Sequence, residues 1–303
     1  MSIAIVGAEA EQLLTWAGLT DALEAGHRRP KAQITDQFLY RGGDTLLNRA
    51  AWIDGLGQLV KVATVFPGNA SHELPSVNGS VTLFDDRTGV LTALVDFHLV
   101  TKWKTAGDSL LSAKRLARKD SRRILLVGAG TVARSMVSAY SSAFPDAAFT
   151  VWSRSRGTAE SMGLPVTDDL EQAVKDADII CTATMAKEPL IRGDWLQHGQ
   201  HLDLIGAYTP AMREVDDTAM ARARLFVDSR ATTIHHIGEL IAPIKSGAIS
   251  ESDVIADFYD DPNAYARRSE DEITIAKNGG GAHLDLMTAD YIARTWAARG
   301  RVV

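Results

Sequence analysis

The amino-acid sequence predicts an α/β protein in which a doubly wound parallel sheet forms one domain and a smaller α+β unit forms a second. Between residues 123 and 228, short apolar runs rich in Val and Ile recur every 23 to 30 residues, separated by segments of helical period. Parallel strands that are buried on both faces give this pattern. The first hundred residues instead alternate in polarity and contain frequent turn residues, which indicates antiparallel strands.

The N-terminal part is expected to combine helices with these antiparallel strands. Apolar residues between 9 and 25 repeat with helical period, so this segment is expected to be a helix. Residues 81–84 and 90–95 flank a turn-forming segment and predict a hairpin. A helical stretch over 101–118 then leads to the polar joint at 118–121, after which the parallel-sheet domain is expected to begin.

The parallel strands and the C-terminal helix complete the predicted elements. Residues 284–299 are helical by pattern, and the glycine run at 279–281 before them indicates a hinge or a close backbone approach. The segments that we expect to form parallel strands are 124–127, 149–152, 179–182, 202–205 and 225–227.

Length and charge exclude several classes of protein. The 303 residues suffice for one large or two ordinary domains. Lys and Arg number 32 against 38 Asp and Glu, a net charge of -6, so no global charge favours nucleic acid or anionic lipid. No apolar stretch approaches membrane-spanning length, and the N-terminus lacks the pattern of a signal peptide. We therefore expect a cytoplasmic protein with neither a nucleic-acid nor a membrane partner.

Cysteine and histidine give no sign of a metal site. The single cysteine, Cys181, lies in an apolar run and is expected to be a packed core thiol. His235 and His236 lack the helical spacing of metal ligands, and no cluster of His, Cys and carboxylates is present in the sequence pattern. We predict no metal. His72, His235, His236 and His283 are candidates for chemistry by residue type only.

A glycine-rich segment follows the first predicted parallel strand. Gly128 and Gly130 lie between this strand and the next helix, and Ala133 is small enough for close packing of that helix on the strand. The first glycine permits a tight turn, the second lets a pyrophosphate approach the backbone, and the helix N-terminus favours an anion. The segment predicts a dinucleotide site, the alternative being a tight turn without a ligand.

The end of the second parallel strand distinguishes between dinucleotides. An NAD site usually carries Asp or Glu there, bound to the ribose 2′-hydroxyl. This chain has Ser153, Arg154, Ser155 and Arg156, and two guanidinium groups with two hydroxyls can hold a 2′-phosphate. We predict that NADP(H) is preferred, with NAD(H) as the alternative cofactor. The competing interpretation is an exposed charged loop that binds nothing.

Several short motifs follow one another in a fixed order along the chain. They are Lys61–Asn69, Thr101–Ala106, Gly128–Ala133, Val151–Ser155, Glu188-Pro189, Gly206-Ala207 with Pro210 and Arg213-Glu214, and Ala276–Gly280 with Asp285. No single motif is diagnostic. Their order and spacing together resemble the ornithine cyclodeaminase and mu-crystallin family over nearly the whole chain.

This resemblance implies a homodimer of two-domain subunits, with a Rossmann-type domain inserted into a smaller substrate-binding and dimerisation domain. We accordingly expect residues 1–115 and 286–303 to form the substrate domain and residues 116–285 the Rossmann domain. Family members bind NAD(P)(H) and act on the Cα–N bond of amino acids or cyclic imino acids. The fold therefore does not choose the reaction.

Departures from the family pattern reduce the number of family reactions that we expect this chain to catalyse. Where ornithine cyclodeaminases carry an Asp that engages the substrate amine, this chain has Tyr208, which favours a ketimine reductase over an enzyme for diamino acids. The family's Arg-Thr pair is Lys104-Thr105 here, so a two-pronged clamp becomes a point charge. An Arg expected in an early strand has no clear counterpart; Gln33 lies opposite it, with Arg41 and Arg49 nearby as replacements.

The resemblance also places Lys61 in the active site. An ammonium there would anchor the substrate carboxylate or stabilise charge as the imine reacts, whereas the alternative is a Lys that faces solvent. We hypothesise that Lys61 and one of Lys104 or Arg49 hold the carboxylate, and that Asn69 orders its loop. The proton source stays open between a substrate that enters protonated, Tyr208 and water.

The predicted function is NADPH-dependent reduction of Δ1-pyrroline-2-carboxylate, and of the six-membered piperideine analogue, to L-proline and L-pipecolate. The alternatives are an ornithine cyclodeaminase, an alanine dehydrogenase and a non-catalytic ligand-binding protein like mu-crystallin. The residues expected to bind the cofactor are Thr105, Gly128, Gly130, Thr131, Val132, Ser153, Arg154, Ser155, Thr184, Met185, Gly206 and Gly280.

Overall fold

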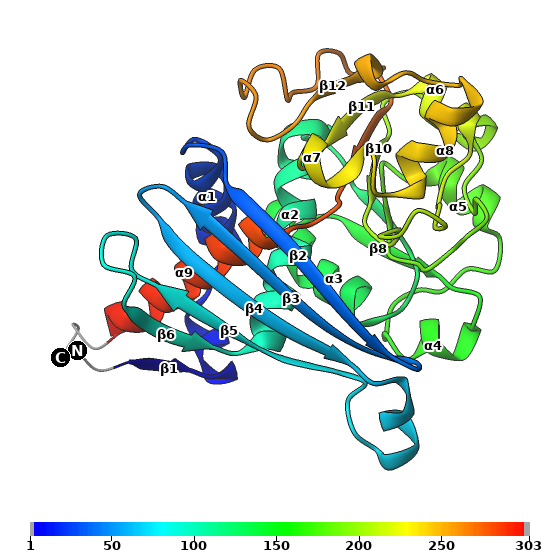
Figure 1. Ribbon diagram of the computed structural model, residues 1–303. Helices are drawn as coiled ribbons and strands as arrows, with labels where there is room; N and C mark the ends of the chain where they lie inside the picture. The colour runs from blue at the N-terminus through cyan, green and yellow to red at the C-terminus, as the bar shows by residue number, and fades with distance from the viewer. Residues whose placement is uncertain (1–2, 300–303) are drawn as a thin grey trace. The chain divides into compact units, whose positions relative to one another are not determined.

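The computed structural model describes residues 3–299 and divides the chain into two compact units (Figure 1). The first unit contains the chain up to Lys104 and from Gly281 onward, and the second runs from Thr105 to Gly280. The sequence-based boundaries lie at 115/116 and 285/286. The first boundary differs because helix α2 (Phe97–Leu116) is continuous across residue 104 and belongs to both units.

A six-stranded sheet forms the first unit, in the order β1-β6-β5-β4-β3-β2. The predicted hairpin is confirmed, because β5 and β6 pair antiparallel. The sequence did not indicate that β1 pairs parallel with β6 at the edge of this otherwise antiparallel sheet. The strands are β1 (Ala4–Val6), β2 (Gln33–Arg41), β3 (Asp44–Ile53), β4 (Gly57–Val65), β5 (Val77–Phe84) and β6 (Leu91–Val95).

Two helices pack against this sheet and against each other. Helix α9 (Ala282–Arg299) crosses one face of the sheet and contacts α1 (Trp16–His27) (Figure 1). The helix expected over residues 9–25 begins only at Trp16, because the Thr15 hydroxyl caps it by accepting a hydrogen bond from the Gly18 amide at 3.1 Å. Short 3-10 turns cover Ala8–Leu13 and Pro67–His72.

The second unit contains a seven-stranded parallel sheet in the order β12-β11-β13-β10-β9-β7-β8. The five predicted strands are confirmed, and the sequence missed β12 and β13 because they are short and β13 is polar at both ends. The strands are β7 (Arg123–Val127), β8 (Ala148–Trp152), β9 (Ile179–Thr182), β10 (His201–Leu204), β11 (Arg224–Val227), β12 (Val254–Ala256) and β13 (Thr274–Lys277).

Helices lie between these parallel strands along the chain, as a doubly wound α/β domain requires. Cys181 in β9 is completely buried, and burial raises the pKa of its thiol well above the usual value, so the prediction of a core thiol is confirmed. Besides α2, the helices are α3 (Thr131–Ala143), α4 (Arg156–Glu160), α5 (Leu170–Asp176), α6 (Asp217–Arg222), α7 (Arg230–Thr233) and α8 (Gly238–Ser246), with 3-10 turns at Gly193–Trp195 and Glu251–Asp253.

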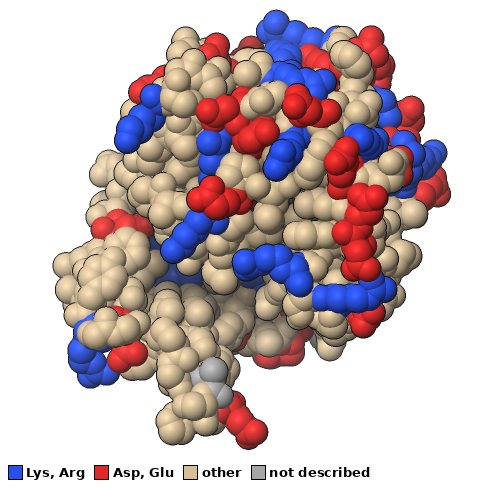
Figure 2. Space-filling model, turned by 90° about the vertical axis from the view of Figure 1, so that its right-hand side faces the viewer, with Lys and Arg blue, Asp and Glu red and all other residues tan. Residues whose placement is uncertain are grey.

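The surface mixes charges of both signs. On the face drawn in Figure 2, basic and acidic side chains are interspersed rather than gathered by sign. Across residues 3–299, the helices are too short or too polar for any of them to traverse a lipid bilayer.

Candidate functional site

A row of charged side chains crosses the sheet of the first unit. Asp36 on β2 lies opposite Arg49 on β3, and Arg49 lies opposite Lys61 on β4, so the three side chains share one face of the sheet. Helix α9 brings Asp285 to this row. The carboxylate of Asp285 accepts a hydrogen bond from Lys61 Nζ at 2.8 Å and one from Arg49 Nη1 at 3.3 Å.

This pairing takes place away from solvent. The side chain of Asp285 is completely buried and that of Lys61 is 6% exposed, so Lys61 does not face solvent. Burial by itself would raise the pKa of Asp285, but the positive charges of Lys61, Lys104 and Arg49 hold it far below its usual value. Burial lowers the pKa of Lys61, and the charge of Asp285 opposes this change.

The Lys61 ammonium is further fixed by its neighbours on α2. It donates a hydrogen bond to Thr101 Oγ1 at 2.8 Å and lies 4.8 Å from the centre of the Phe97 ring. That ring packs directly on the sheet at Gly79, where an added Cβ would lie 2.5 Å from a ring carbon. Glycine at position 79 therefore gives Phe97 the space to cover Lys61.

The cluster carries more positive than negative charge. Arg49, Lys61 and Lys104 contribute three cations, and Asp36 and Asp285 contribute two carboxylates, which leaves one positive charge in excess. Asp36 binds Arg49 through two hydrogen bonds, at 2.5 and 3.1 Å. Within residues 3–299, no hydrogen bond or ion pair is found for the half-buried Lys104. The arrangement is suited to one carboxylate ligand, because a single negative charge would balance it.

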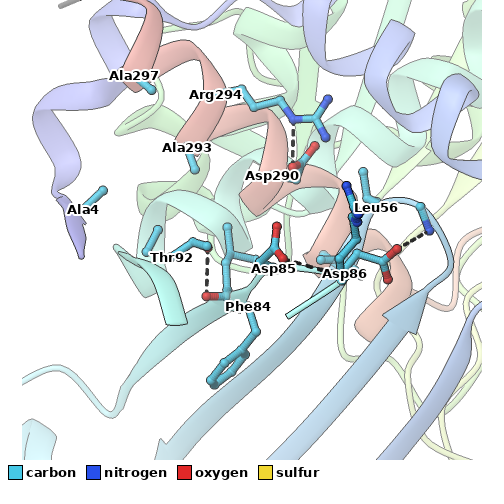
Figure 3. A pocket seen from close by; sticks show the side chains of 15 residues that line it. Ala4, Leu56, Phe84, Asp85, Asp86, Thr92, Asp290, Ala293, Arg294 and Ala297 are labelled. Carbon is cyan, nitrogen blue, oxygen red and sulfur yellow. Dashed lines mark hydrogen bonds and ion pairs between the residues drawn. The ribbon is translucent and has the colours of Figure 1, made fainter. Parts of the chain in front are cut away.

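A pocket elsewhere in the first unit has the opposite charge balance. A pocket of about 500 Å³ lies between α9 and the turn that joins β5 to β6 (Figure 3). It is lined by Asp85, Asp86 and Asp290 against Arg87 and Arg294, and Asp290 accepts a hydrogen bond from Arg294 at 2.9 Å. With one negative charge in excess, this pocket is unsuited to an anionic substrate.

In the second unit, the glycine-rich turn after β7 fits a pyrophosphate. Gly128 has a φ of +111°, and an added Cβ would lie 2.6 Å from the carbonyl oxygen of Ala183, so only glycine is tolerated there. A Cβ at Gly130 would meet nothing within 4 Å, which means that open space borders the backbone. No side chain caps the N-terminus of α3 at Gly130, so the amides of Thr131 and Val132 can bind an anion.

The two arginines after β8 differ in their surroundings. Arg156 forms an ion pair with Glu160 at 2.9 Å and a second one with Asp168. Arg154 is exposed, and no hydrogen bond or ion pair is found for it among the described residues. Ser155 Oγ accepts a hydrogen bond from Thr158 at 2.9 Å. Arg154 is thus the cation of this loop that a ligand phosphate can reach without breaking an ion pair.

Buried carboxylates hold the loops that follow β9, β10 and β13. Glu214 accepts hydrogen bonds from the backbone amides of Thr184 and Gly206, and Asp228 accepts from those of Gly279 and Gly280. Sequence reasoning listed Glu214 within a motif but gave it no role, and it missed Asp228. The available signal for Asp228 was its position as an acidic residue directly after a predicted strand, and for Glu214 its place in the motif that contains Gly206.

The remaining predicted residues lie at or near these places. Met185 and Tyr208 are exposed, at 68% and 60%, and Thr105 lies on α2 at the start of the second unit. Asn69 Nδ2 donates a hydrogen bond to the Pro75 carbonyl at 2.9 Å and so bridges its own loop. Ser153 is half-buried at the end of β8.

Of the three candidates for the missing family arginine, only Arg49 reaches the charged row. Arg41 is 82% exposed and pairs with Asp44 at 3.1 Å. Gln33 pairs with Trp52 near the start of β2.

Among residues 3–299, no group of three or more His, Cys, Asp or Glu is placed to hold a metal ion. Burial lowers the pKa of His283 well below its usual value, so its ring is neutral.

Removing the carboxylate of Asp285 should make the protein less stable. We expect Asp285→Asn to lower the free energy of unfolding by about 3–5 kcal/mol, because Lys61 and Arg49 lose the charge that compensates their burial. The matched control on the same helix is Asp290→Asn, whose pair with the largely exposed Arg294 should cost about 0–1 kcal/mol. Urea denaturation of the three proteins measures both changes, and equal losses would contradict this account of Asp285.

Comparison with known proteins identifies relatives over nearly the whole chain. Residues 54–300 match the ornithine cyclodeaminase/mu-crystallin family. A Δ1-pyrroline-2-carboxylate reductase of Paracoccus denitrificans is 52% identical over 94% of both chains. The solved Thermococcus litoralis Δ1-pyrroline-2-carboxylate reductase in complex with NADH and L-proline superposes with a TM-score of 0.88, 25% identity and 98% of both chains covered. An archaeal alanine dehydrogenase dimer with bound NAD superposes with a TM-score of 0.89 and 25% identity, with 99% of this chain and 98% of that chain covered. The chain therefore belongs to the ornithine cyclodeaminase/mu-crystallin family.

Proposed function

We propose that this protein is a reductase that converts Δ1-pyrroline-2-carboxylate to L-proline with NADPH, and that it also accepts the six-membered Δ1-piperideine-2-carboxylate. The fold alone does not support this choice over alanine dehydrogenase, since both activities occur in relatives of nearly equal TM-score. The 52% identity to a pyrroline-2-carboxylate reductase supports it. The charge of the Lys61 cluster carries the argument from the structure.

One positive charge in excess matches a substrate that has one carboxylate. Lys61 Nζ has three N–H donors and uses two of them, on Asp285 and Thr101. Its third donor and the ammonium of Lys104 are left for the substrate carboxylate, with Arg49 adding to the positive field. Because Asp285 fixes Lys61 before the substrate arrives, the carboxylate enters a preorganised site.

The same cluster disfavours a diamino acid. A second ammonium on the substrate would need a carboxylate partner, and the two carboxylates of the cluster, Asp36 and Asp285, already bind cations. Position 208 offers a phenol rather than an acid. A cyclic imine that enters as its iminium brings the proton that its nitrogen needs, so reduction requires no general acid from the protein.

The cofactor would lie on the second unit. Gly128, Gly130 and the N-terminus of α3 would hold its pyrophosphate, and Arg154 with Ser153 and Ser155 would hold the 2′-phosphate of NADPH. The nicotinamide supplies the hydride when bound. We infer the preference for NADPH from the absence of an acidic residue at 153–156 and from the exposed, unpaired state of Arg154 among the described residues.

An exposed apolar sheet face supports a homodimer. On the face of the first unit's sheet opposite Lys61, Val60 lies beside Thr82, which lies beside Leu94, which lies beside Ile5. Val60, Leu94 and Ile5 are exposed at 38%, 37% and 74%, and Trp52 nearby at 48%. An apolar strip of this kind is usually covered in an assembly, and the archaeal relative is described as a dimer.

Turnover assays with Lys104 variants test the proposed substrate. We expect NADPH absorbance to fall with Δ1-pyrroline-2-carboxylate and to stay constant with pyruvate plus ammonia. We also expect no release of ammonia from ornithine, which is the readout for cyclodeamination because that reaction consumes no NADPH. Lys104→Ala should raise KM for the imine roughly tenfold to a hundredfold, as loss of one charge-assisted contact predicts. Lys102→Ala, two residues before Lys104 on α2 and bound to Glu11 at 2.5 Å, is the control and should leave KM unchanged. Turnover of ornithine but not of the imine would overturn the proposal.

The cofactor preference is tested by comparing the two arginines after β8. We expect Arg154→Ala to weaken NADPH use roughly tenfold to a hundredfold in kcat/KM while leaving NADH use unchanged. Arg156→Ala should change the ratio of kcat/KM with NADPH to kcat/KM with NADH little, because Arg156 already forms ion pairs with Glu160 and Asp168. Steady-state kinetics with both cofactors measure the ratio, and an unchanged ratio in Arg154→Ala would rule out this assignment.

The dimer is tested on the apolar strip. Val60→Glu places a charge in the middle of the strip, so sedimentation should show a monomer where the unaltered protein is a dimer. Leu74→Glu introduces the same charge at a residue that is 56% exposed and lies outside the sheet, and it should stay dimeric. A dimer in both variants would place the interface elsewhere.

A further inference from the structure

Four charged side chains are completely buried near the carboxyl ends of the second unit's parallel strands. Glu214, Asp228, Glu239 and Lys277 each have 0% exposure. The carboxylates of Glu214, Glu239 and Asp228 all act on the charge of Lys277. Burying four charges is costly unless each is paired and hydrogen-bonded, so their hydrogen bonds show what they hold in place.

Glu214 links two loops that follow neighbouring strands. Its Oε1 accepts hydrogen bonds from the Thr184 amide at 2.9 Å and the Thr184 hydroxyl at 2.7 Å. Its Oε2 accepts from the amides of Gly206 at 2.8 Å and Ala207 at 3.2 Å. Thr184 follows β9, and Gly206 with Ala207 follows β10. One carboxylate thereby fixes the distance between these loops.

The loops approach too closely for any side chain to separate them. A Cβ at Gly206 would lie 2.0 Å from the Thr184 carbonyl oxygen and 2.5 Å from Glu214 Oε1. The backbones are therefore in direct contact, and Glu214 supplies the acceptors that their amides lack. Gly206 is needed here because it has no Cβ, rather than because it has an unusual φ angle.

The other members of the cluster hold Glu214 itself. Glu239, on α8, accepts hydrogen bonds from the Glu214 amide at 2.8 Å and the Val215 amide at 3.0 Å. Burial and the charge of Glu214 raise the pKa of Glu239 to about 7. Lys277 Nζ donates to the Leu204 carbonyl at 2.7 Å, directly before the loop that Glu214 binds. The side chain and backbone of Glu214 are thus both fixed.

The position of these loops along the sheet gives the cluster its role. The glycine cradle follows β7, with β8 on one side and β9 followed by β10 on the other. In a doubly wound sheet, a dinucleotide lies across the carboxyl ends of the strands, with its halves on either side of the central strand. The arginine loop that would bind the adenosine half follows β8, so the loops after β9 and β10 lie under the nicotinamide half.

We propose that Glu214 is a positioning residue for the nicotinamide half of the cofactor, because it sets the spacing of the loops after β9 and β10 on which that half would lie. This inference rests on the dinucleotide binding of the proposed function. It goes beyond it, since Glu214 is buried behind the loops and acts through Thr184 and Gly206 rather than by touching the ligand. The adenosine half, bound on the β8 side, should not depend on Glu214.

Binding of two ligands to Glu214→Gln tests this role. Glutamine keeps the shape but replaces one acceptor oxygen by an amide donor, which faces backbone N–H groups. We expect the Kd of NADPH to rise roughly tenfold or more, while the Kd of 2′-phospho-ADP-ribose, which lacks the nicotinamide, stays within about twofold. Glu171→Gln, an exposed residue of α5 paired with Lys175 at 2.6 Å, is the control and should change neither Kd.

A general loss of structure would give a different result, because it would weaken the binding of NADPH and of 2′-phospho-ADP-ribose together. Equal weakening of NADPH and the fragment, or no change in either, would overturn the inference while leaving the proposed function standing. If the unaltered protein binds neither nucleotide, the proposed function fails with it. Should Glu214→Gln not fold, Glu239→Gln serves instead, with the same selective weakening of NADPH expected at about threefold and the same contrary outcomes.

Discussion

The buried ion pair between Lys61 and Asp285 is the interaction on which the charged cluster of the first unit depends. A lysine on a sheet face and an aspartate on a helix 224 residues later lie 2.8 Å apart, almost without solvent. Either charge alone would be costly to bury, but together, and with Arg49, they form a fixed electrostatic framework. That framework joins the sheet to the C-terminal helix within the first unit, so the helix contributes a charge to the candidate site as well as to the fold.

The second unit also contains buried carboxylates, but they have a different role. Its buried carboxylates bind backbone amides rather than cations: Glu214 accepts four hydrogen bonds and Asp228 accepts from Ser229, Gly279 and Gly280. Loops at the carboxyl ends of parallel strands have amides without ladder partners, and a saturated carboxylate satisfies several at once. The first unit thus fixes charge, and the second fixes backbone spacing.

The fold does not separate this chain from relatives with other reactions, so the proposed function rests on sequence identity and on the charge of the Lys61 cluster. The solved relatives include a pyrroline-2-carboxylate reductase and an alanine dehydrogenase that superpose almost equally well. In this chain Arg49 contributes a guanidinium to the cluster, and Lys104 contributes a compact charge without two-pronged geometry. With Lys61 they make three cations against the two carboxylates Asp36 and Asp285, which supports the single-carboxylate ligand of the proposed function.

The sequence by itself determined the elements whose signal is local. The central parallel strands were predicted because buried strands are continuously apolar, and the glycine cradle because its turn demands glycine at 128. Strands β12 and β13 were missed because β12 has only three residues and β13 is polar at both ends. Lys61 was found through a motif, but its partner Asp285 had no assigned role, and the choice among Gln33, Arg41 and Arg49 stayed open. These points required the tertiary structure, because strand register and helix packing determine which charged side chains are in contact. The separation of residues 61 and 285 along the chain does not predict that they form an ion pair.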